Sequence, residues 1–210
     1  RFDLEWVRRN TVVVHYYGRN KPWKENYLGV LGVFYQHFSH QLTEMEQKLP
    51  PEPVPMRREE RRVADTGKIR DILSACDCCR LGLSDDGRVY IVPLSFGYDP
   101  GEPARFYFHS ATEGRKVSMI ADGAKAGFEM DSAHRLGEAE LGCKHTYFFR
   151  SVIGTGTVRP VADLEEKKRA LTLIMAHYRK DRAFSFTDEQ ARTVAVFCLT
   201  VDQMTAKEHT

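Results

Sequence analysis

The sequence lacks several features that would point to particular classes of protein. Its 210 residues contain no secretory signal and no apolar run near the roughly 18 residues that a membrane-spanning helix needs. The net charge of +2 at pH 7 is too small to indicate a nucleic-acid-binding surface. We therefore expect a cytoplasmic protein whose partners are neither membranes nor nucleic acids. Because the first residue is Arg rather than Met, we also expect the sequence to begin inside a longer chain.

Cysteine is scarce, and its spacing argues against both disulfides and metal. Five cysteines, an odd number, do not suit a disulfide framework in a chain of this length. Three of them cluster at Cys76, Cys78 and Cys79, but a zinc site needs a second close pair, and none follows. Cys143 and His145 could complete such a site only if the tertiary fold brought them to the cluster. They are also the one nucleophile-and-base pair close together in sequence. We expect free thiols in a reducing cytoplasm, and no bound metal.

Proline is concentrated in one short segment that divides the chain. Residues 49–55 read Leu-Pro-Pro-Glu-Pro-Val-Pro, with four prolines in seven residues. Proline fixes φ and removes a backbone donor, so this composition predicts an extended linker over residues 50–55. The predicted organisation is an appendage at residues 1–49 and a domain at residues 56–210.

The appendage is too small to bury a core of its own. Residues 11–17 have a strand pattern, and residues 34–45 have a helical pattern with four apolar residues on one side. One strand and one helix bury too little surface to fold alone, so we expect this piece to need a partner.

One motif within the appendage resembles the C-terminal H-x-x-G-x-x-K-P-W motif of family 8 glycosyltransferases. It runs from His15 to Trp23. In that family the positions of His15, Gly18 and Lys21 serve a manganese ion and the sugar-nucleotide diphosphate. The D-x-D carboxylates that complete the metal site are absent from the 210 residues, and a lone histidine is not a metal site. The resemblance covers about residues 1–45 and implies a transferase tail without its catalytic domain.

The larger piece has the pattern of a β-rich domain with a few helices. Asp65 can cap a helix that ends near Ala75, and Asp163 can cap a longer one that ends near Tyr178. Short connections between the strands favour an antiparallel barrel, with helices plugging its ends, over a doubly wound sheet. Strand patterns occupy residues 80–84, 89–96, 104–109, 125–130, 147–158 and 193–201, with a third helix at 112–121, an Asp-Gly turn at 85–88, a Gly/Pro-rich loop at 98–103 and a polar, irregular stretch at 132–146.

The common nucleotide-binding loops are missing, so a phosphate site has to come from another part of the chain. There is no G-x-x-x-x-G-K-S/T run and no G-x-G-x-x-G after a strand. The segment Gly154–Gly156 lies inside a strand pattern, which favours a bulge or a close backbone approach over a phosphate loop.

The junction between the strand at 104–109 and the helix at 112–121 is a better candidate. Helix N-termini offer unpaired N–H groups and a positive dipole, both of which favour phosphate. Nearby side chains add hydroxyls or cationic and hydrogen-bonding groups: Ser110, Thr112, His109, Arg115 and Lys116. The residues alone leave two interpretations open, a phosphate pocket or a capped surface helix with ordinary basic side chains.

Four motifs, in order, resemble the nitroimidazole-resistance (Nim) branch of the pyridoxamine-phosphate-oxidase-like split barrels. Tyr107–Lys116 is similar to the Y-F-H-(small)-A-x-x-G-x-K phosphate loop, and Tyr90–Phe96 is similar to the Y-(I/V)-V-P-(L/V)-x-F strand. Arg150–Gly156 resembles the R-S-V-I-G-x-G strand, and Met204–Glu208 resembles the M-T-G-K-E ending, with Ala206 where glycine is usual. The resemblance covers residues 56–209. It implies a mainly β fold, an antiparallel FMN-binding split β-barrel with peripheral helices.

The resemblance also implies a site and a cofactor. In this family the phosphate loop holds the flavin phosphate and the backbone of the strand at 90–96 lines the flavin ring, in a homodimer with the flavin at the subunit interface. The implied cofactor is FMN, although some relatives bind haem or another flavin-like group. His109 is the implied catalytic residue because it ends a strand at the mouth of the phosphate loop. Carried over position by position, the cofactor-binding residues are Val92, Pro93, Leu94, Tyr107, His109, Ser110, Ala111, Gly114, Arg115, Lys116 and Arg150.

Several of these residues also have a purely structural interpretation. Val92 and Leu94 would be core residues of any strand. Tyr90 and Phe96 suit packing as well as stacking on a cofactor. His134 is expected to be a solvated histidine in a loop.

Three hypotheses for function follow. The first is an FMN-dependent reductase of small nitroaromatic or nitroimidazole-type compounds, in which the flavin supplies redox chemistry and the protein supplies binding and orientation. The second is a non-catalytic flavin-binding module. The third is a C-terminal fragment of a family 8 glycosyltransferase fused to a flavin-binding domain. Cycling of a bound flavin separates the first two, and the sequence upstream of Arg1 would decide the third.

Overall fold

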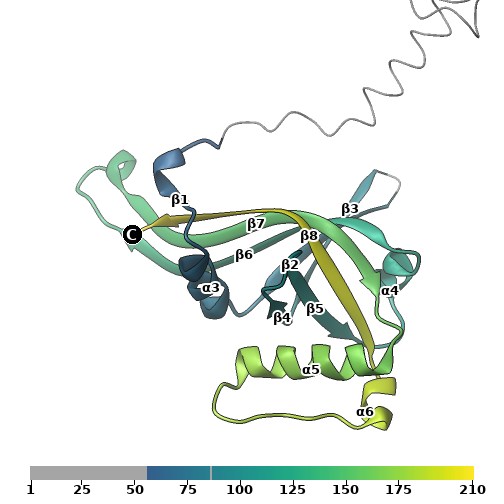
Figure 1. Cartoon of the computed structure of the whole chain (residues 1–210). Helices are drawn as coiled ribbons and strands as arrows, with labels where there is room; N and C mark the ends of the chain where they lie inside the picture. Colours follow the sequence, from purple (N-terminus) through teal and green to yellow (C-terminus); the bar gives the residue numbers. More distant parts are fainter. Residues whose placement is uncertain (1–55, 86) are drawn as a thin grey trace, which may run out of the picture. The chain divides into compact units, whose positions relative to one another are not determined.

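The structure is a computed structural model that describes residues 56–85 and 87–210 (Figure 1). The part from Arg57 to Thr210 forms one unit. The expected strand at 11–17, helix at 34–45, proline linker and glycosyltransferase-like motif lie outside the described residues, so they stay predictions. In the described part of the chain, no helix is long and apolar enough to cross a membrane.

Eight strands and four α-helices make up the described residues, and their labels follow Figure 1. In chain order the elements are η1 (Glu59–Arg61), β1 (Arg62–Val63), α3 (Thr66–Ala75), β2 (Cys79–Asp85), β3 (Arg88–Leu94), β4 (Phe96–Asp99), β5 (Arg105–Ser110), α4 (Arg115–Ile120), β6 (Ala124–Gly137), η2 (Gly142–Lys144), β7 (Thr146–Pro160), α5 (Leu164–Tyr178), α6 (Asp188–Arg192) and β8 (Ala195–His209).

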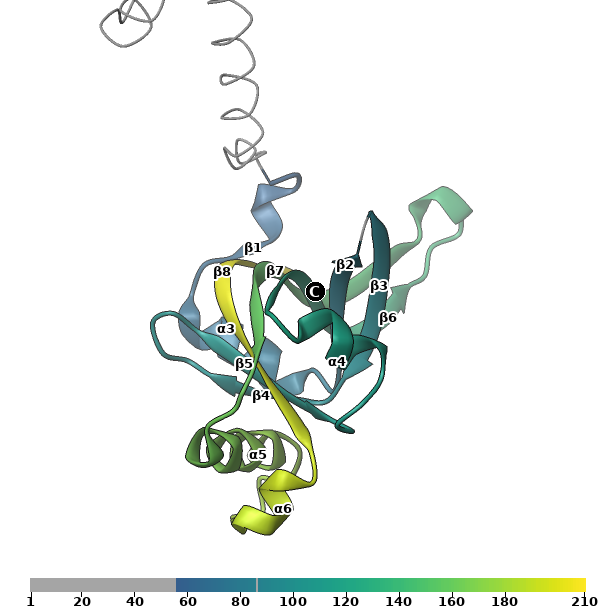
Figure 2. The same cartoon turned by 90° about the vertical axis from the view of Figure 1, so that its right-hand side faces the viewer.

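All the strands belong to one antiparallel sheet that curls into a barrel. Its order is β3-β2-β6-β7-β8-β5-β4, with β1 paired to β8. The two edge strands, β3 and β4, follow each other in the chain and are separated only by Ser95. Figures 1 and 2 show the sheet wrapping around, with α5 on the outside of β4 and β5. The predicted mainly β, antiparallel split barrel with peripheral helices is therefore confirmed.

Two predicted helix starts are confirmed by their caps. The carboxylate of Asp65 accepts a hydrogen bond from the backbone N–H of Lys68 at 2.8 Å and begins α3. The carboxylate of Asp163 accepts one from the N–H of Glu166, also at 2.8 Å, and begins α5. Each bond satisfies one of the donors that a helix leaves unpaired at its start.

A reciprocal capping box occurs at α6, a short helix that the sequence analysis did not predict. There Thr187 and Gln190 each accept a hydrogen bond from the backbone of the other.

Four predicted boundaries were wrong. The last strand was expected to end at residue 201, but β8 continues to His209, because β7 pairs with it up to that residue. The strand expected at 89–96 breaks at Ser95, and residues expected in a loop form β4, because Phe96–Asp99 pair with Arg105–Phe108 of β5. The stretch expected to be irregular at 132–146 continues β6 to Gly137, after a bulge at which Ala133 has a φ of 58°. The helix expected at 112–121 begins only at Arg115.

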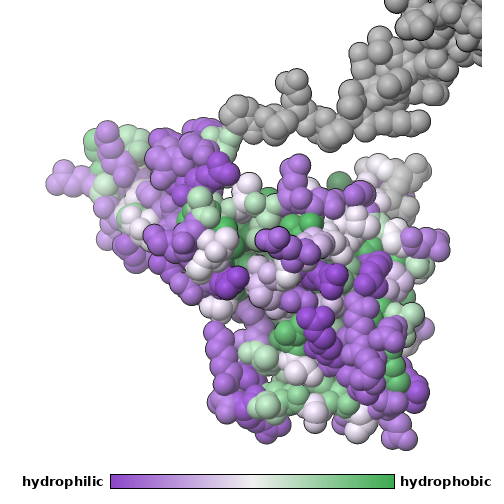
Figure 3. Space-filling model, in the orientation of Figure 1, coloured by the Kyte–Doolittle hydropathy of each residue, from purple (hydrophilic) through white to green (hydrophobic). Residues whose placement is uncertain are grey.

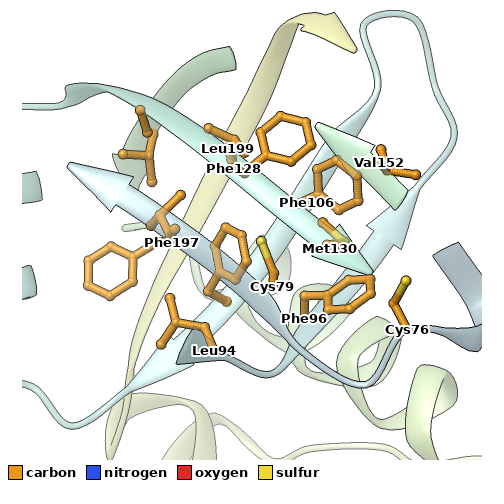
Figure 4. Packing of buried hydrophobic residues seen from close by; sticks show 14 of the residues in the cluster. Cys76, Cys79, Leu94, Phe96, Phe106, Phe128, Met130, Val152, Phe197 and Leu199 are labelled. Carbon is orange, nitrogen blue, oxygen red and sulfur yellow. The ribbon is translucent and has the colours of Figure 1, made fainter. Parts of the chain in front are cut away.

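The core has two parts, which lie on opposite faces of β5. Phe106 points into the barrel, where it packs with aromatic, aliphatic and sulfur side chains such as Phe96, Phe128 and Met130 (Figure 4). Phe108 belongs to the same cluster. Tyr107, between them in sequence, points the other way and packs under α5. This alternation is the period-two pattern of a strand that is buried on both faces.

Glycines in β7 allow the neighbouring strands β6 and β8 to approach closely. A Cβ on Gly154 would lie 2.4 Å from the ring of Phe128, and a Cβ on Gly156 would lie 2.3 Å from the carbonyl oxygen of Thr200. The pairing of β7 with β8 also shifts register between Thr155 and Gly156. The predicted bulge and close approach at this segment are confirmed.

Candidate functional site

The candidate phosphate loop begins where β5 leaves the sheet. His109 and Ser110 are the last paired residues of β5 and lie opposite Val196 and Ala195 of β8. The His109 side chain is exposed, and the Ser110 hydroxyl donates a hydrogen bond to the carbonyl of Ala111 at 2.7 Å. The loop is therefore anchored at one end and open to solvent on its outer side.

Gly114 forms the turn between this loop and α4. Its φ is +117°, which side-chain-bearing residues rarely adopt, and a Cβ at this position would meet no atom within 4 Å. The carbonyl of Gly114 accepts from the N–H groups of Val117 and Ser118 at 3.0 and 3.2 Å. Backbone conformation, rather than lack of space, thus requires the glycine, and the open space beside it leaves the backbone accessible.

The helix that follows is short. α4 spans Arg115–Ile120, and its N-cap, Gly114, has no side chain to satisfy the first N–H groups. A helix this short contributes less dipole than the longer one predicted from sequence. Recognition of phosphate here would depend on backbone N–H groups and the side chains of Ser110, Arg115 and Lys116.

One contact links this loop to the edge strand β3. The guanidinium of Arg115 lies 4.6 Å from the centre of the Tyr90 ring, within the range of a cation–π interaction. Figure 2 shows α4 beside β3 and β2. β3 pairs with β2 on one side only, so its other side carries backbone donors and acceptors without a strand partner among the described residues.

The inner residues of β3 belong to the barrel core. Leu94 is 9% exposed within it, and Tyr90 and Val92 pack against it. Pro93 points to the opposite, exposed face. A contact between β3 and a flavin ring would therefore involve its backbone edge, as the resemblance implies, while Val92 and Leu94 also fill the core.

Tyr107 differs from the other predicted site residues in where its side chain points. It is fully buried under α5, and its hydroxyl lies 3.4 Å from a carboxylate oxygen of Glu166. Burial raises the pKa of this phenol above its usual value. Its side chain does not reach the face of the loop, so Tyr107 could contribute to the site only through its backbone.

Arg150 lies far from the phosphate loop within one chain. Val158 of β7 pairs with Ala124, which closely follows α4, and Arg150 is eight residues further along β7. At about 3.3 Å per residue, this places Arg150 roughly 26 Å away along the strand. Its Nε lies 3.2 Å from Glu208 Oε2 but, among the described residues, is buried without a hydrogen bond. The predicted site residues therefore fall into two separate groups.

The cysteine cluster is confirmed as free thiols in the described residues. Burial raises the pKa of Cys76 to about 11 and raises that of Cys79 further still, so neither thiol ionises readily near neutral pH. In residues 56–85 and 87–210, no three His, Cys, Asp or Glu side chains are grouped as metal ligands.

The other two histidines considered from sequence have structural partners. The Nδ1 atom of His145 lies 3.2 Å from the carbonyl oxygen of Leu141. His134 was expected in a loop, but it lies on β6 with its Nε2 2.8 Å from Asp131 and its ring stacked on Tyr147.

Sequence reasoning gave Tyr90 no specific role in the site. Its contact with Arg115 joins residues 25 positions apart. The aromatic residue at the start of the motif at 90–96 was a signal in the sequence that Tyr90 could belong to the site. Only the tertiary structure shows that its ring faces Arg115. Two surface cavities, of about 320 and 290 Å³, lie elsewhere, and neither includes His109 or Lys116.

The family follows from comparison with known proteins. Residues 65–208, more than half of the chain, match the pyridoxamine 5'-phosphate oxidase family. A candidate 5-nitroimidazole antibiotic resistance protein of Bacteroides thetaiotaomicron VPI-5482 is 35% identical, with a TM-score of 0.59 over 70% of this chain and 85% of that one. Curated proteins gave no match to the chain.

Two more distant structures share the fold. An FAD and heme binding protein of Mycobacterium smegmatis is 18% identical, with a TM-score of 0.62 over 70% of this chain and 73% of that one. A flavocytochrome of Azotobacter vinelandii is also 18% identical, with a TM-score of 0.62 over 77% and 75% of the two chains. The fold, the ordered motifs and the match over residues 65–208 lead to one conclusion: the chain belongs to the pyridoxamine 5'-phosphate oxidase family.

Proposed function

We propose that the protein binds FMN between the loop at residues 110–116 and the open edge of β3. The contact between Arg115 and Tyr90 carries this proposal, because it brings a cationic loop against a strand edge with free backbone groups. The flavin phosphate would meet Ser110, Arg115 and Lys116, while Gly114 leaves room for the backbone to approach it. The ring would lie along β3, where N–H and C=O groups can bind its polar edge.

We also propose that a second copy of the chain completes the site. The outer face of β3, β2, β6 and β7 exposes Val89 at 72%, Ile91 at 63% and Ile153 at 54%. Beside Ile91, the register places Gly82 and then Gly127, so this row is flat and can pack closely. A flat face with exposed apolar residues suits an isologous dimer interface.

A dimer would also give a role to Arg150. It lies too far from the phosphate loop of its own chain to serve that site, and within that chain its Nε is paired with Glu208 at 3.2 Å. Across a two-fold axis, Arg150 would reach the flavin held by the other protomer. The open, solvent-exposed loop of a single chain is consistent with a site that is completed in this way.

As an enzyme, we propose an FMN-dependent reductase of small nitroaromatic compounds. The 35% identical relative is named for 5-nitroimidazole resistance, and that name supports the substrate class. Bound FMN would supply the reducing electrons. His109 would hold the proton: its exposed imidazole stands at the end of β5, at the mouth of the loop, and an imidazole can both donate and accept a proton. The FAD- and haem-binding relatives share only the fold and do not decide between flavins.

A single preparation tests these steps in order. The purified 210-residue chain should bind FMN with saturable quenching of flavin fluorescence, at one FMN per chain, and should elute as a dimer. With oxygen excluded, the bound flavin should then bleach with NADH or NADPH and recover when a 5-nitroimidazole is added as the only oxidant. Failure to bind FMN would refute the proposed cofactor. A flavin that binds but never cycles with either nicotinamide would instead support the alternative, a non-catalytic flavin-binding module.

A further inference from the structure

A recess between α3, α5 and β4 is separate from the proposed flavin site. It has a volume of about 290 Å³, near the lower end of the range for small-molecule sites. Figure 3 shows a notch in the surface between the two helices. The residues that line it include Arg70, Leu73, Tyr98, Leu173, His177 and Lys180.

The walls of the recess are apolar. Leu73 is 1% exposed and belongs to the barrel core, and Leu173 is a half-buried residue packed on the cluster under α5. The ring of Tyr98 lies 5.1 Å from that of Phe106, so it is fixed from behind by the core. A flat apolar group entering the recess would meet side chains that are already held in place.

Two cationic side chains, Arg70 and Lys180, and the phenol of Tyr98 also line this recess. Arg70 comes from α3 and Lys180 follows the end of α5. Burial raises the pKa of the Tyr98 phenol, while the charge of Arg70 lowers it and the charge of Asp99 raises it. In residues 57–85 and 87–210, neither Arg70 nor Lys180 forms an ion pair.

Neighbouring carboxylates are engaged with other cations. Asp99 lies 2.7 Å from Arg169, and Asp181 lies 2.8 Å from Arg179. Asp99 and Asp181 are therefore each paired with an arginine and do not pair with Arg70 or Lys180.

Several backbone carbonyls at the end of α3 already accept a hydrogen bond. Helix C-termini carry carbonyls that would repel an anion. Here His177 Nε2 lies 2.7 Å from the Cys76 carbonyl, and the Tyr178 hydroxyl donates to the Asp77 carbonyl at 2.8 Å. Lys180 approaches the Ser74 carbonyl at 3.4 Å, a long contact that leaves its other donors available.

We propose that this recess binds a small carboxylate with a flat, apolar body, such as an aromatic carboxylate. The carboxylate would lie between Arg70 and Lys180 and accept a hydrogen bond from the Tyr98 hydroxyl. The ring would pack on Leu73 and Leu173. Planar guanidinium groups bind carboxylates through two parallel hydrogen bonds, which favours a carboxylate over a spherical anion.

The test uses 2-naphthoate and its neutral analogue 2-naphthalenemethanol, titrated by calorimetry into the full chain saturated with FMN. We expect saturable binding of the carboxylate and at least about tenfold weaker binding of the alcohol, since charge-assisted bonds dominate the difference. Arg70→Ala should weaken 2-naphthoate binding about 10- to 100-fold. Lys68→Ala, which removes a cation from the same helix outside the recess, should leave it unchanged.

Ala176→Trp gives a second test, because Ala176 is an exposed residue of α5 that lines the recess. The large ring should fill the space and abolish binding without lowering the melting temperature. Equal binding of acid and alcohol, or no saturable binding of the acid, would overturn the proposal. So would binding that survives both Arg70→Ala and Ala176→Trp. Competition with FMN, or loss of binding in Lys116→Ala, would place the ligand in the flavin site instead and overturn it as well.

Discussion

Replacing Gly97 with alanine should destabilise the domain, because this glycine lets α5 pack directly on β4. A Cβ at this position would lie 2.6 Å from the backbone nitrogen of Ile174 and 2.7 Å from the carbonyl carbon of Leu173. Both atoms belong to the helix backbone, so no side chain can rotate away, and α5 must shift. Ordinary carbon contacts need about 3.5 Å or more, so the shift approaches 1 Å.

Overpacking of this kind costs about 1–3 kcal/mol, and the lower entropy of the unfolded alanine chain returns about 0.4–1 kcal/mol of it. We expect a net loss of about 1–2 kcal/mol in the free energy of unfolding. For a domain of this size, that loss lowers the melting temperature by about 2–8 °C. Circular dichroism during heating, followed by urea titration, measures both quantities.

Gly142→Ala is the matched control, because a Cβ there would meet no atom within 4 Å. It should melt within about 2 °C of the parent, since surface substitutions away from special features change stability by at most about 0.5 kcal/mol. A Gly97→Ala protein that melts with the parent would show that α5 does not pack on β4 as closely as described.

Three further outcomes test the site and the domain organisation. Lys116→Ala should weaken FMN binding about 10- to 100-fold by fluorescence titration with little change in melting temperature; an unchanged affinity would remove Lys116 from the site. His109→Asn should retain FMN while nitroimidazole turnover falls about 10²- to 10⁴-fold, and a flavin-loaded variant with full turnover would exclude His109 as the proton donor. A chain that starts at Met56 should stay soluble and melt cooperatively, because residues 57–210 contain the whole barrel; an insoluble or molten product would show that residues 1–55 are needed to fold it.

Local sequence patterns predicted the structure correctly in segments whose conformation depends on their own residues. Asp65 and Asp163 are capping residues, and both helices begin where the carboxylates meet the backbone. The alternation of aromatic residues around Tyr107 indicated a strand, and the glycines of β7 indicated a close approach. A cap or a strand pattern depends on residues only a few positions apart, so it can be recognised in the sequence without the tertiary structure.

Pairing between distant segments determined the features that the sequence analysis missed. Phe96–Asp99 read as the end of one strand and the start of a loop, yet they form β4, because β5 supplies their hydrogen bonds. Residues 132–137 are polar, and β6 extends through them because β7 pairs alongside. Polar composition predicted irregular structure there, but a cross-strand ladder satisfies the same backbone groups.

For the site, the sequence determined which residues belong to the phosphate-loop motif, because Tyr107–Lys116 is continuous in the chain. Only the tertiary structure decided how those residues are used. It turned the Tyr107 side chain away under α5, brought Arg115 against Tyr90, and placed Arg150 eight residues, or roughly 26 Å, along β7 from Val158. It also assembled the recess of Arg70, Tyr98 and Lys180 from α3, β4 and the segment that follows α5. Side-chain direction on a strand and the meeting of distant elements depend on how the whole sheet curls, which no local pattern of residues encodes.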